Sequence, residues 1–342
     1  MNQFSYHRNT LHRRLTCFVN WIRPEDETID QIAAQADFIR SRIKAKAIED
    51  SLLVTATPHS GSFAKRTGLR RHMRGHAEVE GQDVDIPFVV APKDAQGEKL
   101  TELLDRFARY ADSTYPDTAK EPTKSSIKLK FSNRLFFDIV PMLSTGRADE
   151  QIIIRSNGDR LKTSIEKHVA FVRARTKSSD ALAGRVQFNE CVRLMKWWRE
   201  SQSVDNYYFG NGNLPSSMLI DLLCAKAYDE LSVCTTYAET LARWFSLLAS
   251  LVKQRKPIFF SDVNTKQPAD ESAEWCVFDP VNPENNVVKK WGYGEVNELA
   301  DWLAKGRDEW ARAIRFNEDG EDSKSMDSMV RIFGNAFRNH CD

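Results

Sequence analysis

The strongest signal in this sequence comes from two neighbouring stretches, His59-Ser60-Gly61-Ser62 and Asp83-Val84-Asp85-Ile86. Because successive side chains of a β-strand point to opposite faces, the second stretch places Asp83 and Asp85 on one face and buries its apolar residues on the other. Two carboxylates held this close repel each other unless a cation lies between them, and a hard divalent ion prefers oxygen ligands. The pair of acids therefore predicts a site for Mg²⁺.

The Gly61-Ser62 pair lies where a strand is expected to give way to a helix. It follows the apolar, β-rich residues 52–57 and precedes a helix-compatible segment at residues 63–66. A glycine lets the backbone come close to a ligand, and the free N–H groups at a helix start favour phosphate. The strand, the turn and the acids together predict a metal-triphosphate site.

A third acid, Asp138, is the one charged residue in the apolar run of residues 135–140. A carboxylate in such a run loses several kcal/mol of hydration unless it is paired or bound to a metal. This favours Asp138 as a further metal ligand. The alternative is a carboxylate paired with Lys128 or Lys130 across a predicted hairpin, whose first strand covers residues 127–131.

The segment between Ser62 and Asp83 is rich in basic residues, and two interpretations stay open. Arginine matches phosphate with a bidentate fork, so the segment is a candidate for gripping substrate phosphates or nucleic acid. The favoured alternative is a solvated loop that joins two strands, to which Arg70 and Arg71 are the best candidates for an exception because they lie closest to the helix after the Gly-Ser turn. The basic residues are Lys65, Arg66, Arg70, Arg71, His72, Arg74 and His76.

The composition is that of an ordinary globular protein. The chain has 342 residues, 41% of them hydrophobic, and a net charge of +1, so no global basic excess indicates nucleic acid or an anionic membrane. No segment approaches the roughly 20 apolar residues that span a bilayer, and the N-terminus does not read as a signal peptide. The six cysteines are scattered without a C-x-x-C pair, which disfavours a zinc site. We therefore expect a cytoplasmic protein with reduced thiols and no membrane association.

The motifs taken together resemble the polymerase-β-like nucleotidyltransferase superfamily. More narrowly, the chain resembles the bacterial cGAS/DncV-like nucleotidyltransferases (CD-NTases) of anti-phage CBASS systems, and their animal relatives, the oligoadenylate synthases (OAS). Three later stretches in family order carry the narrower match: Leu194-Met195-Lys196-Trp197-Trp198, Leu214-Pro215-Ser216-Ser217-Met218-Leu219, and residues 277–287. The resemblance covers nearly the whole chain.

This resemblance implies an α+β fold: a two-lobed polymerase-β-like nucleotidyltransferase with a mixed catalytic sheet and a helical C-terminal lobe. The expected domains are N-terminal helices at 1–50, a catalytic core at 51–160, a helical OAS-like lobe at 161–316 and a tail at 317–342. Within the first domain, an apolar stripe over residues 29–43 predicts a long helix. It either bridges the two lobes, as in the family, or packs on its own sheet.

The function implied by the resemblance is a Mg²⁺-dependent cyclic oligonucleotide synthase. It would make a cyclic di- or trinucleotide second messenger for anti-phage defence, using two Mg²⁺ ions, with Mn²⁺ as a substitute. The catalytic and metal-binding residues would be Asp83, Asp85 and Asp138; the nucleotide- and phosphate-binding residues would be Gly61, Ser62, Lys196 and Ser217. For Lys196 the alternative is an ordinary helix lysine that extends its charge into solvent.

The resemblance also bears on partners and on rival functions. It implies ATP and other nucleoside triphosphates as substrates and a regulatory partner protein from the same operon, and it leaves a nucleic-acid activator open. One rival function is a linear 2′-5′ oligoadenylate-type synthase or another nucleotidyltransferase. The other is a non-catalytic nucleotide-binding scaffold, against which the three intact acids argue.

Overall fold

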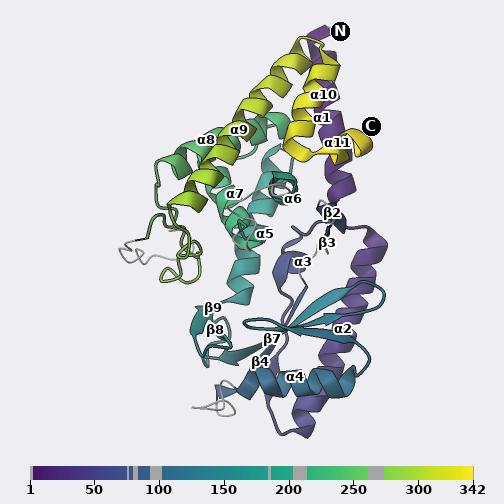
Figure 1. Cartoon of the computed structure of the whole chain (residues 1–342), viewed down its shortest axis with the longest axis vertical. Helices are drawn as coiled ribbons and strands as arrows, with labels where there is room; N and C mark the ends of the chain where they lie inside the picture. Colours follow the sequence, from purple (N-terminus) through teal and green to yellow (C-terminus); the bar gives the residue numbers. More distant parts are fainter. Residues whose placement is uncertain are drawn as a thin grey trace. The chain divides into compact units, whose positions relative to one another are not determined.

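The chain forms two compact units in a computed structural model that describes residues 3–74, 77–79, 84–92, 102–183, 186–202, 214–260 and 273–341. The first, which we call the sheet unit, comprises residues 24–72 and 80–171. The second, the helical unit, comprises residues 1–23, 73–79 and 172–342. Figure 1 labels helices and strands of both units.

The sheet unit is built on a mixed sheet in the order β1-β4-β7-β6-β5, with β8 paired to β7 and β9 paired to β8. β4 and β7 run parallel, and the other neighbours are antiparallel. The predicted hairpin is present as β6 and β7. The strands are β1 (Val54–Ala56), β4 (Asp85–Val90), β5 (Ala119–Pro122), β6 (Ile127–Lys130), β7 (Phe136–Ser144), β8 (Gln151–Ile154) and β9 (Arg160–Thr163).

Three helices complete the described part of the sheet unit: α2 (Asp26–Glu49), α3 (Gly61–Lys65) and α4 (Glu102–Thr114). Alternating residues of β4 and β7 form one core with α2 and α4, and the residues between them form a second cluster with Ile165 of α5 (Ile165–Ala183). Both strands are apolar because both of their faces are buried. The predicted stripe of α2 is buried in that core, at Ile32, Ala36, Ile39 and Ile43. Packing of this helix on its own sheet is therefore confirmed, and its role as a bridge between lobes stays a prediction.

The remaining described helices belong wholly or, for α5, in part to the helical unit, which also contains β3 (Ala77–Val79) and all but the first residue of its partner β2 (His72–Arg74). α5 begins at the end of the sheet unit and continues into the helical unit. Among the described residues, no helix is long and apolar enough to cross a membrane. The helices are α1 (Gln3–Ile22), α5 (Ile165–Ala183), α6 (Phe188–Gln202), α7 (Ser217–Leu231), α8 (Tyr237–Lys253), α9 (Tyr293–Glu318), α10 (Asp322–Phe333) and α11 (Asn335–His340).

An aromatic cluster joins the first helix of the chain to the last ones. Phe18 of α1 is fully buried. The centroid of its ring lies 5.7 Å from that of Trp197, 5.3 Å from that of Phe333 and 5.0 Å from that of Phe337. Trp21 stacks on His340 at 3.8 Å, and Figure 1 shows α1 beside α10 and α11. Since aromatic pairs add about 0.5–1.5 kcal/mol beyond the area they bury, these contacts hold both ends of the chain in one core.

Candidate active site

Two of the predicted acids meet on neighbouring parallel strands. Asp85 is the first residue of β4, and its register partner on β7 is Asp138. The backbone N–H of Asp138 donates to the carbonyl of Val84 at 3.0 Å. Register partners point to the same face, and neighbouring strands lie about 4.8 Å apart, so the two carboxylates leave the sheet side by side. The partner predicted for them, Asp83, lies outside the described residues.

The carboxylate of Asp138 is buried, with 7% of the residue exposed, and it has partners on both oxygens. The hydroxyl of Ser126 donates to Oδ1 at 2.7 Å, and Nζ of Lys128 lies 3.4 Å from Oδ2. Lys128 is the register partner of Asp138 on β6. The pairing with Lys128 considered from the sequence is therefore confirmed, whereas Lys130 pairs with Glu121 at 2.5 Å. A metal-binding role for Asp138 stays a prediction.

The residues present fit a hard divalent cation. Asp85 and Asp138 supply carboxylate oxygens on one face, and the ammonium of Lys128 shows that this face already needs a positive charge. Across the parts of the chain that the structure describes, no group of three or more His, Cys, Asp or Glu side chains is arranged as a metal site. The predicted third carboxylate, Asp83, is not among the residues described.

The Gly-Ser turn has the conformation that its glycine predicts. Gly61 begins α3 with φ of +71°, a left-handed value that an L-residue adopts only at a cost. Ser62 is buried, and its carbonyl accepts a hydrogen bond from the N–H of Thr67 at 3.0 Å. The predicted helix after the turn is present as α3.

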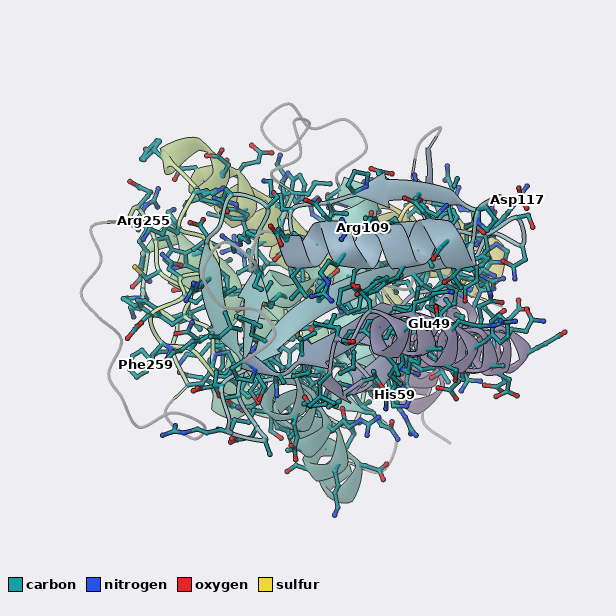
Figure 2. The ribbon with its side chains drawn as sticks, turned by 90° about the horizontal axis from the view of Figure 1, so that it is seen from below. Glu49, His59, Arg109, Asp117, Arg255 and Phe259 are labelled. Atoms are coloured by element: carbon teal, nitrogen blue, oxygen red, sulfur yellow. The ribbon has the colours of Figure 1, made fainter. Side chains whose placement is uncertain are left out.

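Upstream of the Gly-Ser turn, the chain is tied to α2 through its histidine. Figure 2 labels His59, whose Nδ1 lies 3.2 Å from Nη2 of Arg40. Arg40 is itself largely buried and forms an ion pair of 2.6 Å with Asp37. The approach to the turn is therefore fixed by a charged side chain from the core helix.

In the helical unit, Lys196 of α6 is deeply buried rather than solvent-directed. Its Nζ forms an ion pair of 2.8 Å with Asp221 of α7, and both side chains are 4% exposed. The alternative of a lysine that extends its charge into solvent is therefore wrong, because the ammonium has a buried carboxylate as partner. Its predicted contact with phosphate stays a prediction.

Ser217 is the first residue of α7, directly after the residue that caps this helix. The cap is Ser216, whose side chain accepts a hydrogen bond from the N–H of Leu219 at 3.1 Å. Arg199 of α6 donates to the hydroxyl of Ser217 at 3.3 Å and to the carbonyl of Pro215 at 3.0 Å. The start of α7 is thus held by an arginine, and the binding role of Ser217 stays a prediction.

Sequence reasoning missed Ser126, Asp221 and Arg199. Ser126 lies two residues before Lys128, a spacing that places both side chains on one face of a strand. Asp221 is the one charge in the apolar residues 219–225, which is the signal that identified Asp138. Only the contact of Arg199 had no local signal, because it joins two helices.

The sheet unit defines a class of protein. A mixed sheet with two acids in register on parallel strands, after a strand, a Gly-Ser turn and a short helix, is the arrangement of a polymerase-β-like nucleotidyltransferase. Residues 10–175 match the model of the Second Messenger Oligonucleotide or Dinucleotide Synthetase domain. The cyclic AMP-AMP-AMP synthase of Escherichia coli (strain MS 115-1) is 30% identical over 251 residues, which are 71% of each chain. The chain belongs to this family, the CD-NTases.

Solved structures agree with this assignment. The structure of E. coli MS115-1 CdnC with ATP has a TM-score of 0.76 and 26% identity, and the match covers 95% of this chain and 98% of that one. The complex of the same CdnC with HORMA-deltaN has a TM-score of 0.74 and 25% identity, with the same coverage. The family, the fold and the functional class predicted from the sequence, a nucleotidyltransferase that synthesises a cyclic oligonucleotide messenger, are confirmed.

Proposed function

We propose that this chain is a cytoplasmic enzyme that joins nucleoside triphosphates, ATP among them, into a cyclic di- or trinucleotide for anti-phage signalling. The observation that carries the proposal is the in-register pair of Asp85 and Asp138 in a unit that also holds the Gly61-Ser62 turn. Support comes from the relative named as a cyclic AMP-AMP-AMP synthase and from the CdnC structure with ATP.

The acids would hold two divalent ions, Mg²⁺ or Mn²⁺, with Asp83 as the third carboxylate. When bound, such ions activate the attacking hydroxyl and stabilise charge on the phosphates. The chain's own groups position the reactants. Ser126 fixes one oxygen of Asp138 by its hydrogen bond of 2.7 Å, and Lys128 neutralises the carboxylate while no other cation is present.

Four residues are proposed to contact phosphates, and each is supported within its own unit. In the sheet unit these are the backbone N–H groups at Gly61 and the hydroxyl of Ser62. In the helical unit they are Lys196 and Ser217, and the ion pair with Asp221 fixes the position of the lysine. Orientation of the leaving pyrophosphate by such donors is the main contribution a protein makes to nucleotidyl transfer.

Product analysis tests the proposal against a linear 2′-5′ synthase. The purified chain is incubated with each α-labelled nucleoside triphosphate, singly and mixed, with Mg²⁺, and products are treated with phosphatase before chromatography and mass spectrometry. Phosphatase-resistant products that are lost in Asp138→Asn support cyclic synthesis. Phosphatase-sensitive oligomers would identify a linear synthase, and nucleotide binding without any product would support a scaffold.

A regulatory partner protein is part of the proposal. The support is the solved complex of the related CdnC with HORMA-deltaN. Adding proteins encoded beside this chain to the product assay tests it, since a true partner changes the rate of product formation. A nucleic-acid activator is tested in the same assay by adding duplex DNA or RNA, and unchanged rates with every addition would contradict this part of the proposal.

A further inference from the structure

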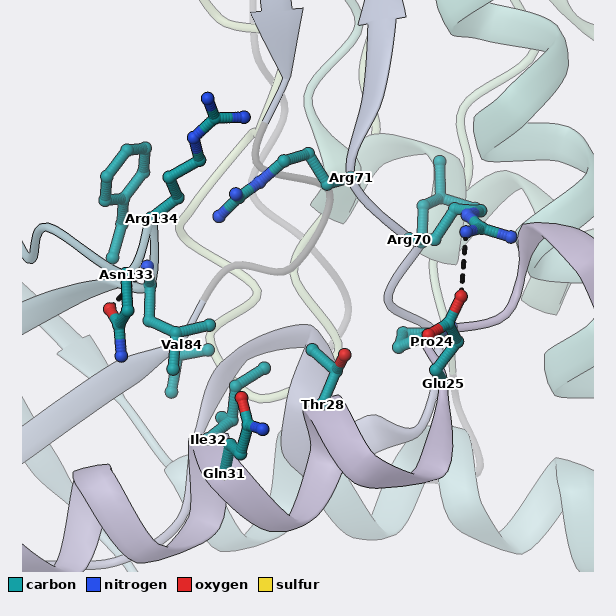
Figure 3. Close-up of a pocket in the computed structure, with 13 residues that line it drawn as sticks. Pro24, Glu25, Thr28, Gln31, Ile32, Arg70, Arg71, Val84, Asn133 and Arg134 are labelled. Carbon is teal, nitrogen blue, oxygen red and sulfur yellow. Dashed lines mark hydrogen bonds and ion pairs between the residues drawn. The ribbon is translucent and has the colours of Figure 1, made fainter.

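The sheet unit contains a pocket of about 240 Å³ that lies beside the strands carrying the acids. Its walls come from the start of α2, from residues 69–71 after α3, and from residues 133–136 at the start of β7 (Figure 3). Val84 lies on its wall directly before Asp85, and Phe136 lies two residues before Asp138. The pocket is therefore built on the same two strand ends as the acids, from different side chains.

The described walls of the pocket carry an excess of positive charge. Three arginines line it, Arg70, Arg71 and Arg134, and Glu25 is the one acid among the lining residues that the structure describes. Arg70 forms an ion pair of 2.9 Å with Glu25. The guanidinium of Arg71 lies 5.9 Å from the ring centroid of Phe136. In Figure 3 the side chains of Arg71 and Arg134 approach the same space from different walls.

The backbone of Arg134 gives an independent observation. Its φ is +62°, in the left-handed region, within the tight turn that joins β6 to β7. Glycine or asparagine occupies such a position at lower cost, and non-glycine residues held in this conformation cluster at ligand sites. The chain thus keeps a strained arginine where its side chain lines the pocket.

We propose that Arg71 and Arg134 bind the di- or triphosphate group of a small ligand in this pocket. Guanidinium forks match phosphate oxygens bidentately, and two of them on facing walls suit a chain of phosphates. The volume is below the roughly 300–1,000 Å³ of pockets that enclose a whole drug-sized ligand, so a phosphate chain fits and a complete nucleotide does not. Phosphate binding follows from the pocket itself. Only the inference that the phosphate chain belongs to a nucleotide rests on the proposed function.

Calorimetric titration of the full chain with inorganic pyrophosphate and with ATP, in EDTA, tests this site. EDTA removes the divalent ions that the acids would use. We expect Arg71→Gln and Arg134→Gly to weaken binding about tenfold or more, the value of a lost charge-assisted contact. If the Arg134-dependent affinity is equal for both probes, the pocket recognises the phosphate chain alone; if the Arg134-dependent binding of ATP is tighter, the ligand is a nucleotide.

The chain offers a matched control in Arg66, which is exposed, has φ of +59° and is not among the residues that line the pocket. Arg66→Gly should keep binding within about twofold. Arg134→Gly should unfold at or above the wild-type midpoint, because glycine relieves the strain, so a loss of binding in this variant is not a loss of fold.

Three results would overturn the proposal. The first is wild-type binding by folded Arg134→Gly, and the second is no binding of either probe by the wild-type chain. The third is Arg134-dependent binding of duplex nucleic acid without binding of the small anions. Asp138→Asn, which is expected to lose turnover, should keep this metal-free binding, so a failure of this site and a failure of the proposed function give different results.

Discussion

The ammonium of Lys128 lies 3.4 Å from the carboxylate of Asp138, and the two residues are register partners on β6 and β7. The sheet therefore supplies one positive charge to a face on which Asp85 and Asp138 would otherwise repel each other. This charge comes from a strand that is not part of the acid motif.

Asp138→Asn should abolish most nucleotidyl transfer while the fold persists. The amide keeps an acceptor for Ser126 but loses the charge that the metal requires, so we expect turnover to fall by more than about 100-fold, beyond the effect of an outer-shell change. Rates of product formation and urea unfolding curves check both parts. Wild-type turnover in this variant would contradict the metal assignment.

Ser126→Ala should weaken metal use rather than eliminate it. Removing the 2.7 Å hydrogen bond frees one oxygen of Asp138, and losses of about 10 to 100-fold in metal affinity or activity are typical of such outer-shell partners. A titration of rate against Mg²⁺ checks this. We expect a higher half-saturating concentration that Ser126→Thr restores, whereas an unchanged metal dependence would limit Ser126 to packing.

Lys128→Met should lower the Mg²⁺ concentration needed for half-maximal rate. The ammonium and the metal compete for the same carboxylate, so its removal favours the metal, while methionine keeps the apolar stem in place. Lys130→Met is the matched control, because Lys130 pairs with Glu121 instead. A loss of stability with unchanged metal dependence would show that the ion pair with Asp138 is purely structural.

Lys196→Met should destabilise the helical unit by about 3–5 kcal/mol, because it leaves the buried carboxylate of Asp221 without its cation. The double variant Lys196→Met/Asp221→Leu should recover this stability, since an apolar pair can replace a buried ion pair. Activity decides the role of the lysine. A stable double variant that remains inactive supports phosphate binding, and a stable, active one would leave Lys196 with a structural role.

Alkaline pH should destabilise the sheet unit through Tyr110. Burial and a hydrogen bond to Asp50 raise the pKa of this phenol from its usual 10.0 to about 12. The folded state therefore favours the protonated phenol, and its contribution to stability is complete below about pH 10 and is lost as the pH rises toward 12. Urea unfolding across this range checks it, and Tyr110→Phe should flatten the dependence. An equal slope in both proteins would contradict the assignment.

Much of the catalytic core could be predicted because its signals are local. The left-handed turn at Gly61 and the buried strand position of Asp138 each follow from the geometry of one turn or one strand, whereas the pairing of Asp83 with Asp85 stays a prediction. The register that brings Asp85 beside Asp138 is a long-range pairing, which no local pattern determines. The sequence could supply that pairing only through the family resemblance.

The environment of each site residue was harder to predict than its position. Burial of Lys196 depends on its ion pair with Asp221 in the next helix. The pocket is lined by Arg134, which lies in a turn, where a charged side chain normally extends into solvent. Arg70 and Arg71, the candidates for a role within the basic segment, line the pocket, and that role stays a prediction. No local pattern indicated that the start of α2 lies opposite these arginines in the pocket.

The helical unit combines α1 and residues 73–79 with residues that follow position 171. During synthesis, α1 is made before the sheet unit, whereas the aromatic partners of Phe18 on α10 and α11 are made after it. Domains generally fold as units and N-terminal ones fold first, which favours early folding of the intervening sheet unit. Until α10 and α11 have been made, α1 therefore lacks the rings that cover Phe18, and its apolar face is open to chaperones or to aggregation.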